Sequence, residues 1–153
     1  MTKKSNNIEL VFEILRNEVN GNVKSAQKKM HDDFTVTYMY KNKKSELFPS
    51  FSKPSDFDLS EIYKIKDKSY EIKNYAENNF DKYDVVFVEL IERYTDPKTG
   101  KKYQTPIVIV LEIEDGKIKT NRHYCGNDLS FEDISAETIN SAFKGESQEI
   151  FVD

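Results

Sequence analysis

Apolar residues near the start of the chain recur every three or four positions, which is the spacing of an amphipathic helix. The stripe consists of Ile8, Val11, Phe12, Leu15 and Val19. Polar residues at 5–7 are suitable caps for the beginning of this helix, and Gly21 is a suitable end. A second, shorter helix is expected immediately after this glycine, with Ala26 and Met30 on one face.

The rest of the chain is rich in runs of β-branched and aromatic residues, which predict strands. The expected strands cover residues 34–40, 69–76, 84–95, 103–114 and 117–125. A turn is expected at 96–100, where proline and glycine occur together, and Asp115-Gly116 favours a two-residue type I′ turn. Two further short helices are expected, at 59–66 and 133–144.

Helices followed by an antiparallel meander predict an α+β fold, not a wound α/β sheet. The length fits one domain over residues 1–153, with an ordered core at 7–144 and a C-terminal tail at 145–153. Residues 41–57 form a long predicted loop that contains several phenylalanines. Two interpretations of this loop remain open, a packed surface loop and a lid over a functional site.

The turn at Asp115-Gly116 also predicts the register of the hairpin around it. In a hairpin without irregularities, Glu114 faces Lys117, and further along the strands Val108 faces His123. Apolar residues occur on both faces of this hairpin, which indicates a sheet covered on both sides. A homodimer formed through the sheet is therefore the expected assembly.

Composition narrows the class of protein. The chain is 37% hydrophobic and 33% charged with a mean hydropathy of -0.72, yet 12% of its residues are aromatic, which is too many for a disordered chain. With only three arginines and a net charge of -4, we expect no nucleic-acid partner. No apolar run is long enough to span a bilayer or to act as a signal core, so we expect no membrane association. A single cysteine excludes an intrachain disulfide, and a cytoplasmic location is expected.

The segment 114–118 (Glu-Asp-Gly-Lys-Ile), followed by Arg122 and Tyr124, resembles an ending common in the nuclear-transport-factor-2-like, SnoaL-like superfamily. The position of Pro106 and the helix, turn, helix and strand pattern of residues 8–40 are similar to that superfamily as well. The resemblance implies a cone-shaped, curved antiparallel sheet packed on N-terminal helices. It implies no single activity, because this fold serves cyclases, isomerases, hydrolases, dehydratases and non-enzymatic binders.

Ketosteroid isomerase, one member of this superfamily, needs a carboxylate base and two hydrogen-bond donors. The resemblance places its oxyanion-hole tyrosine on Ile14, its base on Tyr38 and its protonated aspartate on Val108. Ile14 and Val108 cannot donate a hydrogen bond, and tyrosine is a poor base at neutral pH. We therefore expect no steroid isomerisation by that mechanism.

The limonene-epoxide-hydrolase pattern places an arginine between two aspartates. Arg93 resembles the arginine, but the aspartates fall on Thr95 and His123, so epoxide hydrolysis is a weak alternative. The acid–base aspartate of many SnoaL-like members falls on Gly126, with Asp128 two residues further on.

His123 is the candidate general base, because the pKa of a histidine lies near neutrality. The candidate ligand-binding residues are Arg93, Asn121, Tyr38, Val108 and Cys125. For His123 the alternative is a histidine that hydrogen-bonds within a half-buried sheet. Arg93 has the alternative of an ion pair with Glu89 or Glu92, and Cys125 that of a small packed residue. His31 beside two aspartates has no second histidine at ligand spacing, so neither a metal nor another cofactor is expected.

Two functions of different class remain open. One is a pocket that binds a small apolar or oxygenated molecule, with or without catalysis, in which His123 and Arg93 would reach a common ligand atom. The other is a non-catalytic dimeric interaction or assembly domain, whose interior would be filled by Phe34, Phe80 and Phe87.

Overall fold

Three stretches of the chain, residues 3–39, 65–126 and 128–152, are described by the computed structural model. The predicted loop 41–57 lies outside them, and so does the predicted helix 59–66 apart from its last two residues, which are not helical. No helix within the described stretches is long and apolar enough to cross a membrane.

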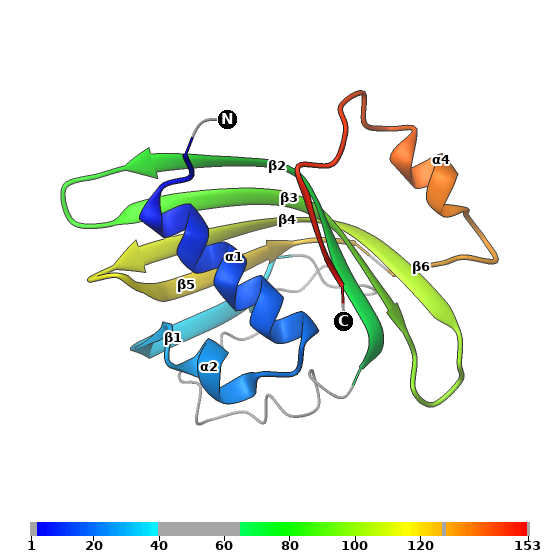
Figure 1. The fold of residues 1–153 in the computed structure, drawn as a ribbon, viewed down its shortest axis with the longest axis horizontal. Coiled ribbons are helices and arrows are strands. Elements are labelled where there is room, and N and C mark those ends of the chain that lie inside the picture. The colour runs from blue at the N-terminus through cyan, green and yellow to red at the C-terminus, as the bar shows by residue number, and fades with distance from the viewer. Residues whose placement is uncertain (1–2, 40–64, 127, 153) are drawn as a thin grey trace.

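The described part of the chain contains helices at both ends and a large sheet between them (Figure 1). Its helices are α1 (Asn6–Val19), α2 (Val23–Gln27) and α4 (Ala136–Asn140). Its strands are β1 (Met30–Tyr38), β2 (Lys66–Asn79), β3 (Asp84–Thr95), β4 (Lys102–Glu114), β5 (Lys117–Tyr124), β6 (Leu129–Ser130) and β7 (Glu149–Val152). The predicted bounds of β3 are confirmed, whereas β1 begins four residues earlier than predicted and β2 is longer at both ends.

Helix α1 begins and ends where the sequence predicts. The Ser5 side chain accepts a hydrogen bond from the amide of Ile8 at 3.2 Å, which satisfies one of the free amides of the first turn. Gly21 follows the helix with a φ of 73°, a left-handed conformation that glycine adopts without a steric penalty.

The sheet has the strand order β1-β5-β4-β3-β2-β7, and β6 pairs with β4. All neighbouring strands are antiparallel except β1 and β5, which are parallel. Figure 1 shows a curved, unclosed sheet with α1 lying across one face. The predicted α+β class is therefore confirmed, with one parallel pair in an otherwise antiparallel sheet.

We call the face of the sheet that packs against α1 the inner face, and the opposite face the outer face. The inner face and α1 share one hydrophobic core, in which Phe12 is the largest helical side chain and is fully buried. The strand residues of this core include Ile72, Val86, Val88, Leu90, Ile107, Ile109, Leu111 and Ile113. Because side chains alternate along a strand, the residues between these core positions belong to the outer face.

The turn between β4 and β5 has the predicted type I′ conformation. Asp115 and Gly116 both have positive φ angles, 52° and 73°, as this turn requires. Glu114 pairs with Lys117 across the turn, as predicted.

Beyond the turn the register shifts by one residue, because Lys119 has no partner in β4. Val108 therefore faces Tyr124, and His123 faces Ile109. The predicted pairing of Val108 with His123 was wrong, since turn length fixes the register only in a hairpin without a bulge. This bulge is what brings His123 to the inner face; without it, alternation would place this residue on the outer face.

Within the predicted tail 145–153, the described residues 145–152 include a strand. Strand β7 pairs with β2, with Phe151 opposite Tyr70, and the Phe151 ring packs edge-on against Phe12 with centroids 5.5 Å apart. Four residues are too few for a reliable strand prediction, so the sequence pattern missed this edge strand. The predicted helix at 133–144 is shorter in the structure, where only α4 is helical.

Candidate functional site

Three of the predicted site residues lie on the inner face of β5 or directly after it. Asn121 faces Leu111 and His123 faces Ile109, both core positions of β4, and Cys125 packs against the same core. The Oδ1 atom of Asn121 is buried and has no hydrogen-bond partner within the described residues. The backbone of Tyr38 pairs with that of His123 through the parallel β1–β5 ladder, while its side chain lies outside what the structure describes.

Arg93 and Val108, which the sequence analysis placed in the same site, lie on the outer face. Arg93 is one residue out of phase with the inner positions of β3, and Val108 is one residue out of phase with Ile109. The predicted meeting of Arg93 and His123 at one ligand atom was therefore wrong, because the two side chains are on opposite faces of the sheet.

Arg93 instead belongs to a buried ionic network on the outer face. Its Nη1 atom is 2.5 Å from Glu71 Oε2, and Lys73 Nζ is 2.7 Å from Glu71 Oε1. Ser147 also donates a hydrogen bond to Glu71, and Gln104 donates one to the carbonyl of Ile134 at 2.9 Å. The network thus attaches the segment around α4 to the sheet. The interpretation of Arg93 as a structural ion-pair residue is confirmed, with Glu71 and not Glu89 or Glu92 as its partner.

The inner face carries a group of charged and polar side chains that the sequence analysis did not single out. We call Glu18, Lys68, Tyr70 and Glu92 the inner polar cluster. Tyr70 donates a hydrogen bond to Glu18 Oε2 at 2.8 Å, which connects α1 to β2. Lys68 Nζ is 3.3 Å from Glu92 Oε2, and the same nitrogen lies 5.1 Å from the centre of the Tyr70 ring.

Burial shifts the protonation equilibria of this cluster. It raises the pKa of Glu18, although Lys68 and the hydrogen bond from Tyr70 act in the opposite direction. The pKa of Tyr70 is also raised, first by burial and then by the nearby carboxylates of Glu18 and Glu92. At neutral pH, Tyr70 is therefore a hydrogen-bond donor and not a phenolate.

The charges of this cluster contribute to the pKa of His123. Its pKa is lowered to about 4, mainly by burial; Glu92 opposes this shift and Lys68 adds to it. The imidazole is therefore neutral at physiological pH, the form in which one ring nitrogen is a donor and the other an acceptor.

A second polar group continues from the cluster along the inner face. Thr105, opposite Glu92 in the β3–β4 ladder, donates a hydrogen bond to Asp128 Oδ1 at 2.5 Å. Tyr94 donates another to the second oxygen of Asp128. Asp128, two residues after the position expected for a cyclase aspartate, is therefore held by two hydroxyl groups.

Simple periodicity could have indicated the inner polar cluster. Glu18 lies three residues after Leu15, at the edge of the apolar stripe of α1. Glu92 continues the inner row of β3 after Leu90, and Lys68 precedes Tyr70 in the inner row of β2. A charged residue in a buried row is a signal for a paired or functional group, but its partner lies on another element and cannot be read from one strand.

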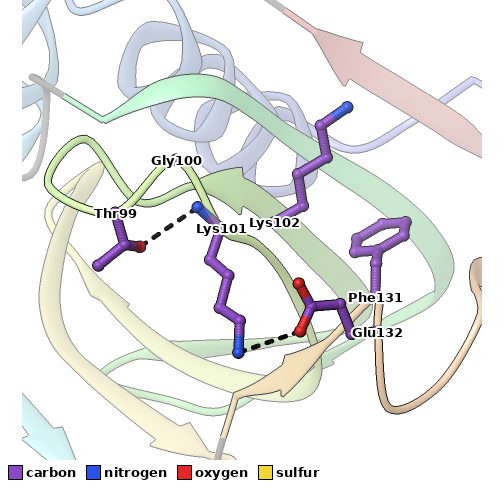
Figure 2. Close-up of a pocket in the computed structure, with 6 residues that line it drawn as sticks. All are labelled: Thr99, Gly100, Lys101, Lys102, Phe131 and Glu132. Atoms are coloured by element: carbon purple, nitrogen blue, oxygen red, sulfur yellow. Dashed lines mark hydrogen bonds and ion pairs between the residues drawn. The ribbon is translucent and has the colours of Figure 1, made fainter.

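A surface groove lies apart from these side chains. It is lined by Thr99, Gly100, Lys101, Lys102, Phe131 and Glu132 (Figure 2). In Figure 2 the side chain of Lys101 points toward Glu132, and the two charged atoms are 3.3 Å apart. Both members of this ion pair are well exposed to water, which leaves little driving force for specific recognition. We therefore assign the candidate site to the inner face.

No set of three or more His, Cys, Asp or Glu side chains in the described ranges is arranged to hold a metal ion.

No protein-family model and no curated protein matches this chain. Solved structures do match. They include a nuclear-transport-factor-2-like protein of unknown function from Cytophaga hutchinsonii, with 14% identity over 82% of this chain and 94% of the other and a TM-score of 0.51. An LEH-like epoxide hydrolase from M. tuberculosis has 16% identity over 90% of this chain and 92% of its own and a TM-score of 0.55.

A Δ5-3-ketosteroid isomerase from Mycobacterium sp. is similar over 79% of this chain and 93% of its own, with 17% identity and a TM-score of 0.57. At such identities the similarity concerns the path of the backbone and not the reaction. The order of elements, the curved sheet and these similarities agree: the chain has the nuclear-transport-factor-2-like fold.

Proposed function

We propose that the protein binds a small organic molecule, apolar with an oxygen function, at the inner face of the sheet. The observation that carries this proposal is the inner polar cluster together with the neutral His123, set beside the apolar side chains of the core. Ligand sites commonly combine an apolar wall with a few convergent polar groups. The buried Oδ1 of Asn121, without a partner in the described part of the chain, is a further acceptor on this face.

If the bound molecule reacts, we propose His123 as the general base. Its neutral imidazole can accept a proton, and the Tyr70 hydroxyl, turned from Glu18 toward the substrate, would donate a hydrogen bond to a developing negative charge on oxygen. These roles suit a divergent cyclase, isomerase or hydrolase. They do not include Arg93, which is occupied by Glu71 on the outer face.

A ligand screen tests the proposal directly. Small cyclic alcohols and ketones are added to the protein, and binding is followed by protein-observed NMR and by the unfolding temperature. We expect saturable binding that is weakened about tenfold or more by His123→Ala, because one acceptor is lost. His31→Ala, a change of the other histidine, is the matched control and should leave binding unchanged. Absence of binding by every compound in both assays would contradict the proposal.

A homodimer through the outer face is a second proposal, and exposed apolar side chains favour it. Phe87 and Val108 are each 37% exposed on neighbouring strands, in a region of the outer face that lies beyond the Arg93 network. The interaction hypothesis required aromatic side chains that fill the interior. Phe34 is buried, but Phe80 and Phe87 are exposed and do not fill it.

The charges around these two residues suit a symmetric contact. Glu89 pairs with Val108 in the β3–β4 ladder, and Arg122 lies beside Val110 on the same face. A two-fold axis would set Arg122, which pairs with Glu112 of its own chain at 2.8 Å, against the same face of the other copy.

The mass of the protein in solution tests the dimer. Light scattering coupled to gel filtration should give twice the chain mass for the wild type. The double variant Phe87→Lys with Val108→Lys should give one chain mass, because buried lysines without partners oppose association. Pro106→Lys, a change of an exposed residue on the same face and strand, tests whether the effect is local. A wild-type mass of one chain across a wide concentration range would rule the dimer out.

A further inference from the structure

We infer that the paired side chains of Lys68 and Glu92 make the inner-face site selective for uncharged ligands. This inference rests on the proposed binding function and specifies its ligand class: neutral alcohols and carbonyl compounds, as opposed to carboxylates and amines.

The two charges of this pair lie close together on neighbouring strands. The ammonium and carboxylate are 3.3 Å apart, and only 6% of the Lys68 side chain and 21% of the Glu92 side chain are exposed. The Tyr70 ring lies against the ammonium at 5.1 Å, which provides a further favourable contact. Both charges are therefore largely removed from water and depend on each other.

The titratable groups that face this pair are each held by a hydrogen bond or shifted toward the uncharged form. From α1, Glu18 is shifted by burial toward its uncharged form and accepts the hydrogen bond of Tyr70. From β5, His123 is neutral above about pH 4. Asp128 is bound by the hydroxyls of Thr105 and Tyr94. The cluster thus offers hydrogen bonds while its one strong ion pair is balanced internally.

A charged ligand would disturb this balance. A carboxylate that approaches Lys68 also approaches Glu92, and an ammonium that approaches Glu92 also approaches Lys68. Either ion would lose its hydration and gain an attraction offset by a repulsion of similar size. An uncharged hydroxyl or carbonyl group loses less hydration and can still hydrogen-bond with His123, Asn121 or Tyr70.

Removal of one charge should therefore weaken or abolish the preference for the alcohol over the ion that is opposite in sign to the remaining charge. In Glu92→Gln the amide keeps the shape of the side chain, but Lys68 loses its counterion. A ligand carboxylate can then take the place of that counterion. In Lys68→Met the carboxylate of Glu92 becomes the unpaired charge, which an ammonium ligand can neutralise.

Three probes with one carbon skeleton test this inference: cyclohexylmethanol, cyclohexanecarboxylate and cyclohexylmethylammonium. Binding is measured by protein-observed NMR at about pH 7, where the three probes are neutral, negative and positive. We expect the wild type to bind the alcohol about tenfold or more tightly than either ion. Glu92→Gln should gain about tenfold in affinity for the carboxylate, and Lys68→Met should gain similarly for the ammonium.

The matched control is Glu89→Gln, the same substitution on the same strand but on the outer face, where Glu89 accepts a hydrogen bond from Asn74. It should keep the wild-type preference. Where a single variant does not fold, the double change Lys68→Met with Glu92→Gln removes both charges together and should retain the preference for the alcohol.

The outcomes separate the two proposals. Binding of either ion by the wild type as tightly as the alcohol overturns the selectivity inference and leaves the proposed function standing. A folded Glu92→Gln protein that binds the alcohol but gains nothing for the carboxylate overturns the inference too. If none of the three probes binds any of the proteins, the proposed function is contradicted, and the inference falls with it.

Discussion

Single side chains in this protein gain their roles from the face of the sheet on which they lie. The neighbours Glu92 and Arg93 point to opposite faces; the first joins the inner polar cluster, and the second joins the outer network of Glu71 and Lys73. The sequence analysis singled out His123, and the structure places this residue on the inner face. The sequence could not show that Arg93 and His123 are separated by the sheet, because that depends on a bulge elsewhere in β5.

The Glu71 carboxylate is expected to be important for stability. Glu71→Gln leaves Arg93 and Lys73 without their buried counterion and should lower the free energy of unfolding by about 3 kcal/mol. Chemical denaturation at neutral pH measures the loss. Glu89→Gln, at a half-buried site on the same face whose hydrogen bond from Asn74 is exposed, should change stability by less than about 0.5 kcal/mol; equal effects of the two substitutions would refute the structural role of Glu71.

The same residue should make stability depend on acidity. Burial alone would raise the pKa of Glu71, but hydrogen bonds from Arg93, Lys73 and Ser147 outweigh it and lower the pKa to about 2. The folded pKa is below the ordinary value of 4.5, so this stabilisation is complete above about pH 4.5 and is lost as the pH falls toward 2. Denaturation curves over this range should differ between wild type and Glu71→Gln, and the difference should shrink with acidification.

Among whole elements, those with long periodic patterns were predicted well, and those that depend on distant partners were not. Helix α1 and the strands β3 to β5 follow from local spacing and turn chemistry, and the positive φ angles of Asp115-Gly116 agree with the predicted turn. The bulge at Lys119 has no comparable local signal, because it is stabilised by pairing on both sides of β5. Strand β7 was missed for a related reason: four residues form a strand only because β2 offers them an open edge.

Strand β7 should contribute to stability although it lies at the C-terminal end. Phe151→Ala removes a ring that is 5% exposed and packs against Phe12, and we expect a loss of about 3 kcal/mol in the free energy of unfolding. Val152→Ala, one residue away and 63% exposed, should cost less than about 0.5 kcal/mol. If both substitutions were equally mild, the C-terminal residues would be the tail that the sequence pattern first indicated.

For the molecule as a whole, fold and candidate site differ in how much the sequence reveals. The α+β class and the resemblance to the nuclear-transport-factor-2-like fold could be predicted, because they depend on the order of elements and on turn residues. The site could be predicted only in part. Glu18, Lys68 and Glu92 come from three elements that the curved sheet and α1 bring together, and no sequence spacing relates them.

The central claim is that His123 lies on the buried inner face beside the inner polar cluster, and its protonation tests this most directly. Nitrogen NMR of the imidazole across a pH series gives the midpoint of the titration of His123 in the folded protein. We predict a neutral ring at physiological pH and a midpoint of about 4, because burial disfavours the charged form. A midpoint near the unperturbed value of 6.5 would place the imidazole in water and contradict the assignment of the site.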